Sequence, residues 1–391
     1  MRKTADVIIV GGGVLGSSIA FHLAERGVGV TLVEKDSLAA GPTGRSCGII
    51  RQHYSHPITV RMALESLHFF ENFEERVGGN CDFRKTGYLL AVGPDDIERL
   101  EANVALQQSL GVNTRVVSLD ELRELEPGVS TEGIVGAAYE PDSGYADPYS
   151  TTAALANRAE ELGAEILTGT RVQSIIVEGG KARGVLTDEG RLEAGSVVLA
   201  TGPWSPRLAA ALGVELPITL CRVQVCLFNR AEELVQDQVF IDSPLGVYTR
   251  PEGDDLMLVG SIETDEAQAG VEDPDHFQRV ADFDAVSRYS EQLIRRFPLM
   301  EKGSFLNGYA SLYDVTPDWQ PILDALPGVE NLYCAAGSSG HGFKLAPRIG
   351  EMMAELVIVG KSPEDDIEFF SFDRFARGQR VDGGYAHKIL G

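Results

Sequence analysis

Three glycines near the N-terminus and the glutamate that follows them have a spacing typical of nucleotide chemistry. Gly11, Gly13 and Gly16 form a G-x-G-x-x-G pattern, and Glu34 ends the next apolar run. Such glycines permit a tight turn, close approach of the backbone to a pyrophosphate, and packing of a helix on a strand, while the acid accepts hydrogen bonds from ribose hydroxyls. The sequence therefore predicts a dinucleotide site; a βαβ unit without a ligand is the alternative.

The elements that must position these residues have the required order. An apolar run at residues 7–10 predicts a buried strand, an amphipathic helix follows Gly13, and a second strand ends at Glu34. The N-terminus of that helix would offer backbone N–H groups and a positive dipole end to phosphates.

Two later segments of the chain also show patterns typical of a nucleotide-binding α/β domain. Asp147 and Pro148 are typical of a helix start, and short strand-like runs follow, ending in the turn at residues 200–202. A glycine-rich loop at residues 337–344 precedes an apolar periodic segment that predicts a helix over residues 347–359.

Between these segments, the pattern of expected strands and helices changes, which predicts two domains. Residues 1–82, 142–220 and 308–391 carry the nucleotide-binding signals. Residues 83–141 and 221–307 carry alternating strand-like runs and charged helices. The simplest arrangement is a discontinuous α/β cofactor domain with an inserted α+β substrate domain, whose mixed sheet lies over the cofactor.

Composition limits the class of partner. With 34 Lys and Arg against 58 Asp and Glu, the formal net charge is −24, so we expect no nucleic-acid partner. The five cysteines are scattered without a C-x-x-C pair, so we expect neither a disulfide framework nor a metal site.

No apolar run approaches the about 18 residues of a membrane span, and glycines interrupt the apolar N-terminal run. We therefore expect a cytoplasmic protein without a membrane span or signal peptide.

Several motifs together resemble a known family. They are the GGGVLG turn, GRSCGIIR at residues 44–51, ATG at residues 200–202, and AAGSSGHGFK at residues 335–344. Over essentially its whole length the chain is similar to the flavin-dependent amino-acid oxidoreductases, which include D-amino-acid oxidase, glycine oxidase, sarcosine oxidase and archaeal L-proline dehydrogenase. It is most similar to the sarcosine oxidase and proline dehydrogenase β-subunit branch. The resemblance implies a Rossmann-like, two-dinucleotide-binding domain that holds FAD.

The resemblance also assigns cofactor contacts. The glycine turn would hold the pyrophosphate, Glu34 and Lys35 the region of the AMP ribose, and residues 337–344 would cross the isoalloxazine. The positive end of the helix expected at residues 347–359 would point at the flavin N1 and C2 carbonyl oxygen, where reduction places negative charge. The full set of implied cofactor residues is Gly11, Gly13, Val14, Leu15, Gly16, Glu34, Lys35, Arg45, Ser46, Cys47, Val172, Gly202, Trp204, Gly337, Gly340, His341, Gly342, Phe343 and Lys344.

On the substrate side, Arg51 and Lys344 match the two cations that hold the substrate carboxylate in sarcosine oxidase. The alternatives are an ion pair within its own loop for Arg51 and a surface position for Lys344. Tyr313 and Tyr248 match aromatic residues of that family's pocket; the alternative is that they are core tyrosines. His341 is expected to support the glycine loop rather than to act as a base.

The chain departs from the monomeric sarcosine oxidases at three positions. Ser311 stands where those enzymes attach their flavin through a cysteine, so the resemblance implies non-covalent FAD. Leu258 and Ile262 stand near the positions of a lysine that promotes reaction with oxygen and of a histidine close to the amine. Oxygen as the acceptor and sarcosine as the substrate therefore both stay open.

We expect an enzyme that oxidises the C–N bond of a secondary or N-substituted amino acid by hydride transfer to flavin N5, giving an imine that water hydrolyses. Candidate substrates are sarcosine, other N-alkylglycines, iminodiacetate and proline. One alternative is a catalytic dehydrogenase subunit of a hetero-oligomer that acts on D-amino acids or proline and passes electrons to a partner subunit. The other is a non-catalytic flavoprotein that assists assembly, against which the presence of both Arg51 and Lys344 argues.

Overall fold

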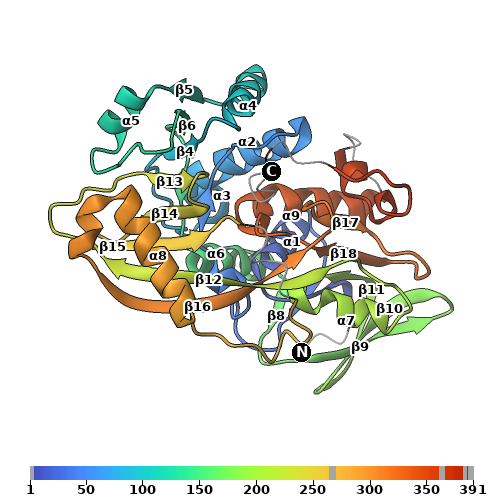
Figure 1. Ribbon diagram of the computed structural model, residues 1–391. Coiled ribbons are helices and arrows are strands. Elements are labelled where there is room, and N and C mark those ends of the chain that lie inside the picture. Colours follow the sequence, from blue (N-terminus) through green and yellow to red (C-terminus); the bar gives the residue numbers. More distant parts are fainter. Residues whose placement is uncertain (1–3, 264–269, 361–365, 382–384, 386–391) are drawn as a thin grey trace.

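The computed structural model describes residues 4–263, 270–360, 366–381 and 385, and contains two large sheets (Figure 1). In the first sheet the strand order is β17-β18-β11-β1-β2-β8, with β10 also paired to β11 and β9 to β10. Its strands are β1 (Thr4–Val10), β2 (Val30–Val33), β8 (Glu165–Leu167), β9 (Val172–Glu178), β10 (Lys181–Thr187), β11 (Gly190–Leu199), β17 (Ile322–Ala325) and β18 (Leu332–Ala336). The central run from β18 to β8 is parallel.

Strand β1 shows why the centre of this sheet reads as an unbroken apolar run. Ile8 and Ile9 are both fully buried but point to opposite faces, because side chains alternate along a strand. Ile9 packs in the core with helices α1 (Val14–Glu25), α6 (Pro148–Glu161) and α9 (Gly342–Val359). Ile8 packs in a second core with β9, β10 and the short helix α7 (Ser205–Ala210).

The second sheet is mixed, as expected, with strand order β16-β12-β15-β14-β13-β4-β6-β5. All its pairs are antiparallel except that of β13 with β4. Its strands are β4 (Tyr88–Val92), β5 (Arg115–Val117), β6 (Gly136–Glu140), β12 (Thr219–Asn229), β13 (Val239–Asp242), β14 (Val247–Glu252), β15 (Leu256–Ser261) and β16 (Ser304–Val315).

Helices pack against the second sheet. Helix α8 (Phe283–Arg296) buries Tyr289 and Leu293 in a core with β12 and β15, and lies over these strands in Figure 1. The remaining described helices are α2 (Pro57–Glu71), α3 (Phe73–Val77), α4 (Ile97–Ser109) and α5 (Leu119–Leu125). The structure thus has the expected α/β fold with an additional mixed sheet.

The division into domains stays a proposal, and strand β16 bears on one of its boundaries. Residues of β16 pair with β12 as far as Val315, so residues 308–315 belong to the second sheet rather than to the first. A boundary that follows the sheets would therefore lie after Val315. Residues 361–365, 382–384 and 386–391 of the expected third segment lie outside the described residues.

One expected helix boundary is wrong. The helix predicted over residues 347–359 begins at Gly342, and Pro347 lies inside it. Phe343, Leu345 and Ala346 are almost fully buried in the core around α1. Their packing extends the helix toward its N-terminus and outweighs the tendency of proline to mark a helix start.

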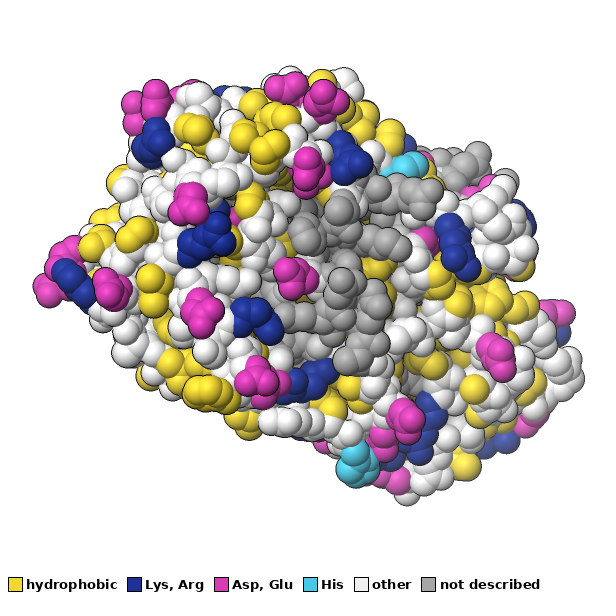
Figure 2. Space-filling view, in the orientation of Figure 1, with side chains coloured by type: hydrophobic (Ala, Val, Ile, Leu, Met, Phe, Trp, Pro, Cys, Tyr) yellow, Lys and Arg dark blue, Asp and Glu magenta, His cyan; other side chains and the backbone are white. Residues whose placement is uncertain are grey.

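Charge is distributed over the surface. On the face drawn in Figure 2, acidic and basic side chains are interspersed.

Among the residues that the structure describes, no helix is both long and apolar enough to cross a membrane. Nor do three His, Cys, Asp or Glu residues of this part of the chain gather where a metal ion could be held.

Candidate active site

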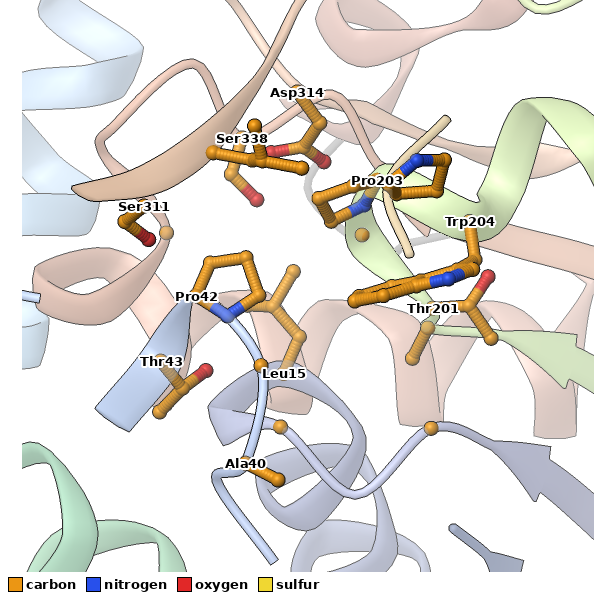
Figure 3. A pocket seen from close by; sticks show the side chains of 18 of the residues that line it. Leu15, Ala40, Pro42, Thr43, Thr201, Pro203, Trp204, Ser311, Asp314 and Ser338 are labelled. Atoms are coloured by element: carbon orange, nitrogen blue, oxygen red, sulfur yellow. The ribbon is translucent and has the colours of Figure 1, made fainter. Parts of the chain in front are cut away.

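A cavity of about 1030 Å³ lies between the two sheets. It begins at the carboxyl ends of β1, β2 and β11, where Val10, Val33 and Ala200 line it, and reaches strands β12, β14 and β16 of the second sheet. Open parallel sheets commonly bind ligands at such carboxyl ends. Figure 3 shows Ser311 and Ser338 along one side of the cavity and Pro42 and Thr43 along the other.

The glycine turn at the start of α1 is a close-packed structure. A Cβ atom on Gly16 would lie 1.9 Å from the carbonyl oxygen of Gly11, and one on Gly11 would lie 2.4 Å from the carbonyl oxygen of Ala200. Gly11 also has a φ of 110°, which disfavours other residues. Gly13 is the N-cap of α1 and has no side chain to cap the helix, and Val14 and Leu15 of the first turn line the cavity, so the N-terminus of α1 faces it.

Glu34 is held rigidly at the edge of this turn. One carboxylate oxygen accepts a hydrogen bond from the Gly12 amide at 2.7 Å, and the other accepts one from the Asp36 amide at 2.8 Å. Glu34 also lines the cavity. The carboxylate is therefore oriented by the backbone and presents its remaining lone pairs to a ligand.

Lys35 and Trp204 form one wall near Glu34. The Lys35 ammonium lies 3.8 Å from the centre of the Trp204 ring and donates to Asp275 Oδ1 at 2.7 Å. The indole N–H of Trp204 donates to the same oxygen at 3.0 Å. No sequence motif indicates that Asp275, far along the chain, reaches this wall.

The segment after β2 lines the middle of the cavity. It contains η1 (Thr43–Arg45), followed by Ser46 and Cys47, and Arg45 donates to the carbonyl oxygens of Ala40 at 2.7 Å and Gly41 at 3.1 Å. The hydroxyl of Thr43 accepts a hydrogen bond from the Val14 amide at 3.1 Å. Sequence reasoning did not identify Thr43, which joins this segment to the start of α1.

The glycine loop before α9 is fixed by an acid that sequence reasoning also missed. Asp314 of β16 accepts a hydrogen bond from the Gly337 amide at 2.7 Å, and its carbonyl oxygen accepts one from the Ser339 amide at 3.0 Å. Burial raises the pKa of Asp314 to about 6 despite the hydrogen bonds that it accepts. The one available signal was an acidic residue between Tyr313 and Val315, in a strand that contains no other charged residue.

Lys344 lies in the first turn of α9 and lines the cavity. Its side chain is only 8% exposed and donates to the Gly340 carbonyl oxygen at 3.3 Å. Burial, and next the positive charge of Arg51, lower the pKa of Lys344 to about 7. A surface position for this lysine is thereby excluded.

Arg51 is buried close to the cavity but is not among the residues that line it. It follows the short pair of β3 (Ile49–Ile50) with β7 (Gly144–Tyr145), and its guanidinium donates to the His53 carbonyl oxygen. The guanidinium also lies 4.3 Å from the centre of the Tyr54 ring.

Three members of the implied cofactor set, to which Arg51 does not belong, also do not line the cavity: Gly16, Gly337 and His341. Gly16 packs α1 against the turn, as expected for the third glycine. A Cβ on Gly337 would lie 2.4 Å from a methyl group of Thr316. His341 is the N-cap of α9, is 1% exposed and packs on the Tyr54 ring. All other members of the set line the cavity.

Tyr248, Tyr313 and Ser311 line the cavity from the second sheet. Burial raises the pKa of both tyrosines, so their hydroxyls stay protonated near neutral pH. Leu258 and Ile262 are buried in the apolar cluster that contains Tyr248. The second-sheet wall is therefore formed in part by the two tyrosine rings and the Ser311 hydroxyl, while Leu258 and Ile262 lie in the core and do not line the cavity.

The residues present fit FAD. The cavity has room for a dinucleotide, its glycine turn leaves the backbone of α1 open to a pyrophosphate, and Glu34 is preset for a ribose. The fold and cavity thus define a dinucleotide-binding α/β protein with a second sheet across the ligand.

Comparison with known proteins agrees. Residues 6–356 match the family described as FAD dependent oxidoreductase, so the chain belongs to this family, whose cofactor is FAD.

The chain is similar to proteins of different sizes. It is 30% identical to FAD-dependent oxidoreductase domain-containing protein 1 of Bos taurus, over 97% of this chain and 86% of that protein. It is 28% identical to sarcosine oxidase subunit beta of Arthrobacter sp, over 97% and 93%. L-proline dehydrogenase from P. horikoshii superposes with a TM-score of 0.90 at 28% identity, over 97% of this chain and all of that one. The chain spans only 42% to 46% of several other curated relatives.

Proposed function

We propose that this chain binds FAD non-covalently and oxidises the C–N bond of a secondary amino acid, such as an N-alkylglycine or proline, whose carboxylate is held by Lys344 with help from Arg51. The observation that carries the proposal is the buried ammonium of Lys344 at the end of a dinucleotide cavity. Similarity to sarcosine oxidase subunit beta and to an L-proline dehydrogenase supports a secondary amine, since both named substrates are secondary amino acids.

The charge of Lys344 explains its fit to a carboxylate. A buried lysine whose pKa is about 7 carries an ammonium that little water stabilises. A substrate carboxylate would restore the missing interaction and favour the protonated form. Arg51 adds a second positive charge that lies close enough to lower the pKa of Lys344.

Other residues would position the donor carbon. When bound, the flavin ring supplies the hydride acceptor. Tyr248 and Tyr313, with neutral hydroxyls, would form the wall beside the substrate and exclude water. The N-terminus of α9 lies at Gly342 in the cavity and would place a positive dipole end where reduction adds negative charge.

Anaerobic addition of amino acids to the purified holoprotein tests this function. N-methylglycine, N-alkylglycines or proline should bleach the visible absorbance of the flavin, whereas the corresponding amines without a carboxylate should not. Bleaching by the amines alone would contradict the role of Lys344. Acid precipitation should release the flavin into the supernatant, because Ser311 offers no thiol for attachment.

A second candidate is a dehydrogenase subunit that passes electrons to a partner subunit. Leu258, buried on β15, supplies no charge near the position expected for an oxygen-activating lysine. The name of the Arthrobacter relative describes a subunit. Faster reoxidation of the reduced protein by an artificial dye than by air would favour this candidate, and reoxidation by air at the rate of efficient oxidases would exclude it.

A further inference from the structure

Residues 270–281 form a segment, here called the strap, whose two ends are fixed to the second sheet. At one end, the Val271 amide donates to the Leu220 carbonyl oxygen at 2.8 Å. At the other, the Ala310 amide donates to the Arg279 carbonyl oxygen at 2.8 Å, and the Arg222 guanidinium donates to the carbonyl oxygens of nearby strap residues. The ends of the strap therefore move with strands β12 and β16.

The middle of the strap crosses to the first sheet's side of the cavity. Pro274, Asp275 and Phe277 line the cavity near its Glu34 end. Asp275 is the residue that accepts from Lys35 at 2.7 Å and from the Trp204 indole at 3.0 Å. Both donors belong to the opposite side of the cavity, on segments that follow β2 and β11.

The contact between Asp275 and Lys35 is an ion pair between half-buried side chains. The side chains of Lys35 and Asp275 are 20% and 26% exposed. Burial alone would raise the pKa of Asp275, but the hydrogen bonds from Lys35 and Trp204 lower it, so the carboxylate is ionised at neutral pH. Asp273 helps to present it, since its carboxylate accepts from the Asp275 amide at 2.9 Å.

We propose that the strap closes the adenosine end of the cavity and that Asp275 is its latch, a positioning residue that must release Lys35 and Trp204 before FAD enters or leaves. Asp275 Oδ2 also lies 3.7 Å from the Arg207 guanidinium, on the same wall of the cavity as Trp204. With both ends of the strap anchored, these contacts of Asp275 connect its middle to the opposite wall, and a dinucleotide would have to displace them. The inference rests on FAD binding, which the family supports, and not on the identity of the amino-acid substrate.

The test compares Asp275→Ala with Glu272→Ala, which removes the same charge from an exposed position of the strap. FAD association with the apoprotein and FAD release from the holoprotein are followed by flavin fluorescence. A latch predicts that Asp275→Ala accelerates both rates about tenfold, the scale of one lost charge-assisted hydrogen bond, and changes the Kd by less than about threefold. Glu272→Ala should leave both rates within about twofold of the native values, as an exposed charge contributes little.

Two results would overturn the latch. If only release accelerates and the Kd rises by the same factor, Asp275 is a direct contact of the cofactor; if neither rate changes, the strap does not control access. Should Asp275→Ala fail to fold, Lys35→Met removes the Lys35 part of the same contact, leaves the Trp204 hydrogen bond, and must also accelerate both rates. Neither rate requires an amino-acid substrate, so failure of the proposed oxidation would leave this test intact.

Discussion

At the adenosine end of the cavity, the site is made largely by the backbone: glycines leave no room for side chains, and Gly12 and Asp36 amides orient the one carboxylate, Glu34. At the proposed substrate end, the site is made by buried side chains, where burial and Arg51 lower the pKa of Lys344. The first construction fixes geometry before any ligand binds. The second stores unfavourable electrostatic energy that an anionic ligand can relieve.

This difference implies that the two ends can be damaged separately. Changes at the adenosine end should reduce FAD affinity and spare turnover of the loaded enzyme. Changes at the substrate end should reduce turnover and spare FAD content.

The largest effect is expected from Lys344→Met, which keeps much of the side-chain volume and removes the charge. We expect kcat/KM to fall about 100-fold or more, because a substrate carboxylate would enter a buried site without its charged partner. FAD content, measured by absorbance, should stay near that of the native protein. Lys302→Met, at an exposed ion pair with Glu233, is the matched control and should leave kcat/KM unchanged. If Lys344→Met lost FAD but kept a normal kcat/KM when loaded with FAD, Lys344 would serve cofactor binding and not substrate binding.

A smaller effect, on FAD affinity rather than on kcat/KM, is expected from Glu34→Gln. The amide can accept at only one of the two positions that the carboxylate now serves, so the Gly12 or Asp36 amide loses its acceptor. The Kd for FAD should rise about 10- to 100-fold, corresponding to a charge-assisted hydrogen bond of about 1.5–3 kcal/mol. Fluorescence titration of the apoprotein measures it. Unchanged FAD affinity together with reduced kcat/KM at saturating FAD would contradict the assignment.

The smallest effect is a pH dependence at the substrate end. Below pH 7 Lys344 is protonated and attracts a carboxylate, whereas above its pKa of about 7 the free site loses the proton and the attraction. The Kd of a carboxylic acid that lacks the amine should therefore rise up to about tenfold between about pH 6 and about pH 8. Lys344→Arg should remove this rise, because a guanidinium stays protonated. A Kd that is flat in the native protein would show that Lys344 does not meet the carboxylate.

Local patterns predicted many elements well because their causes are local. The helix expected after Asp147 is α6, and the Asp147 carboxylate accepts from the Ser150 amide at 2.6 Å as an N-cap. The start of α9 was predicted wrongly because proline is a local signal, whereas the burial of Phe343 and Leu345 depends on packing against distant segments.

The residues of the candidate site likewise divide into those that local sequence patterns predict and those that only the folded chain brings together. The glycine turn and Glu34 were predictable because they lie within one βαβ unit of the sequence. Thr43, Asp275 and Asp314 were missed because the amides and side chains that they bind come from other segments, brought near only by folding.

The sequence by itself determined the dinucleotide-binding turn, since the glycine spacing and the apolar run before it act over neighbouring residues. The family was expected from the resemblance of motifs along the chain, and the family match over residues 6–356 confirms it. The tertiary structure alone decided the lowered pKa of Lys344 and the contact of Asp275 with Lys35. A pKa depends on burial and on charges from remote segments, such as Arg51 beside Lys344. An ion pair between strap and cavity wall likewise exists only when the two sheets have come together.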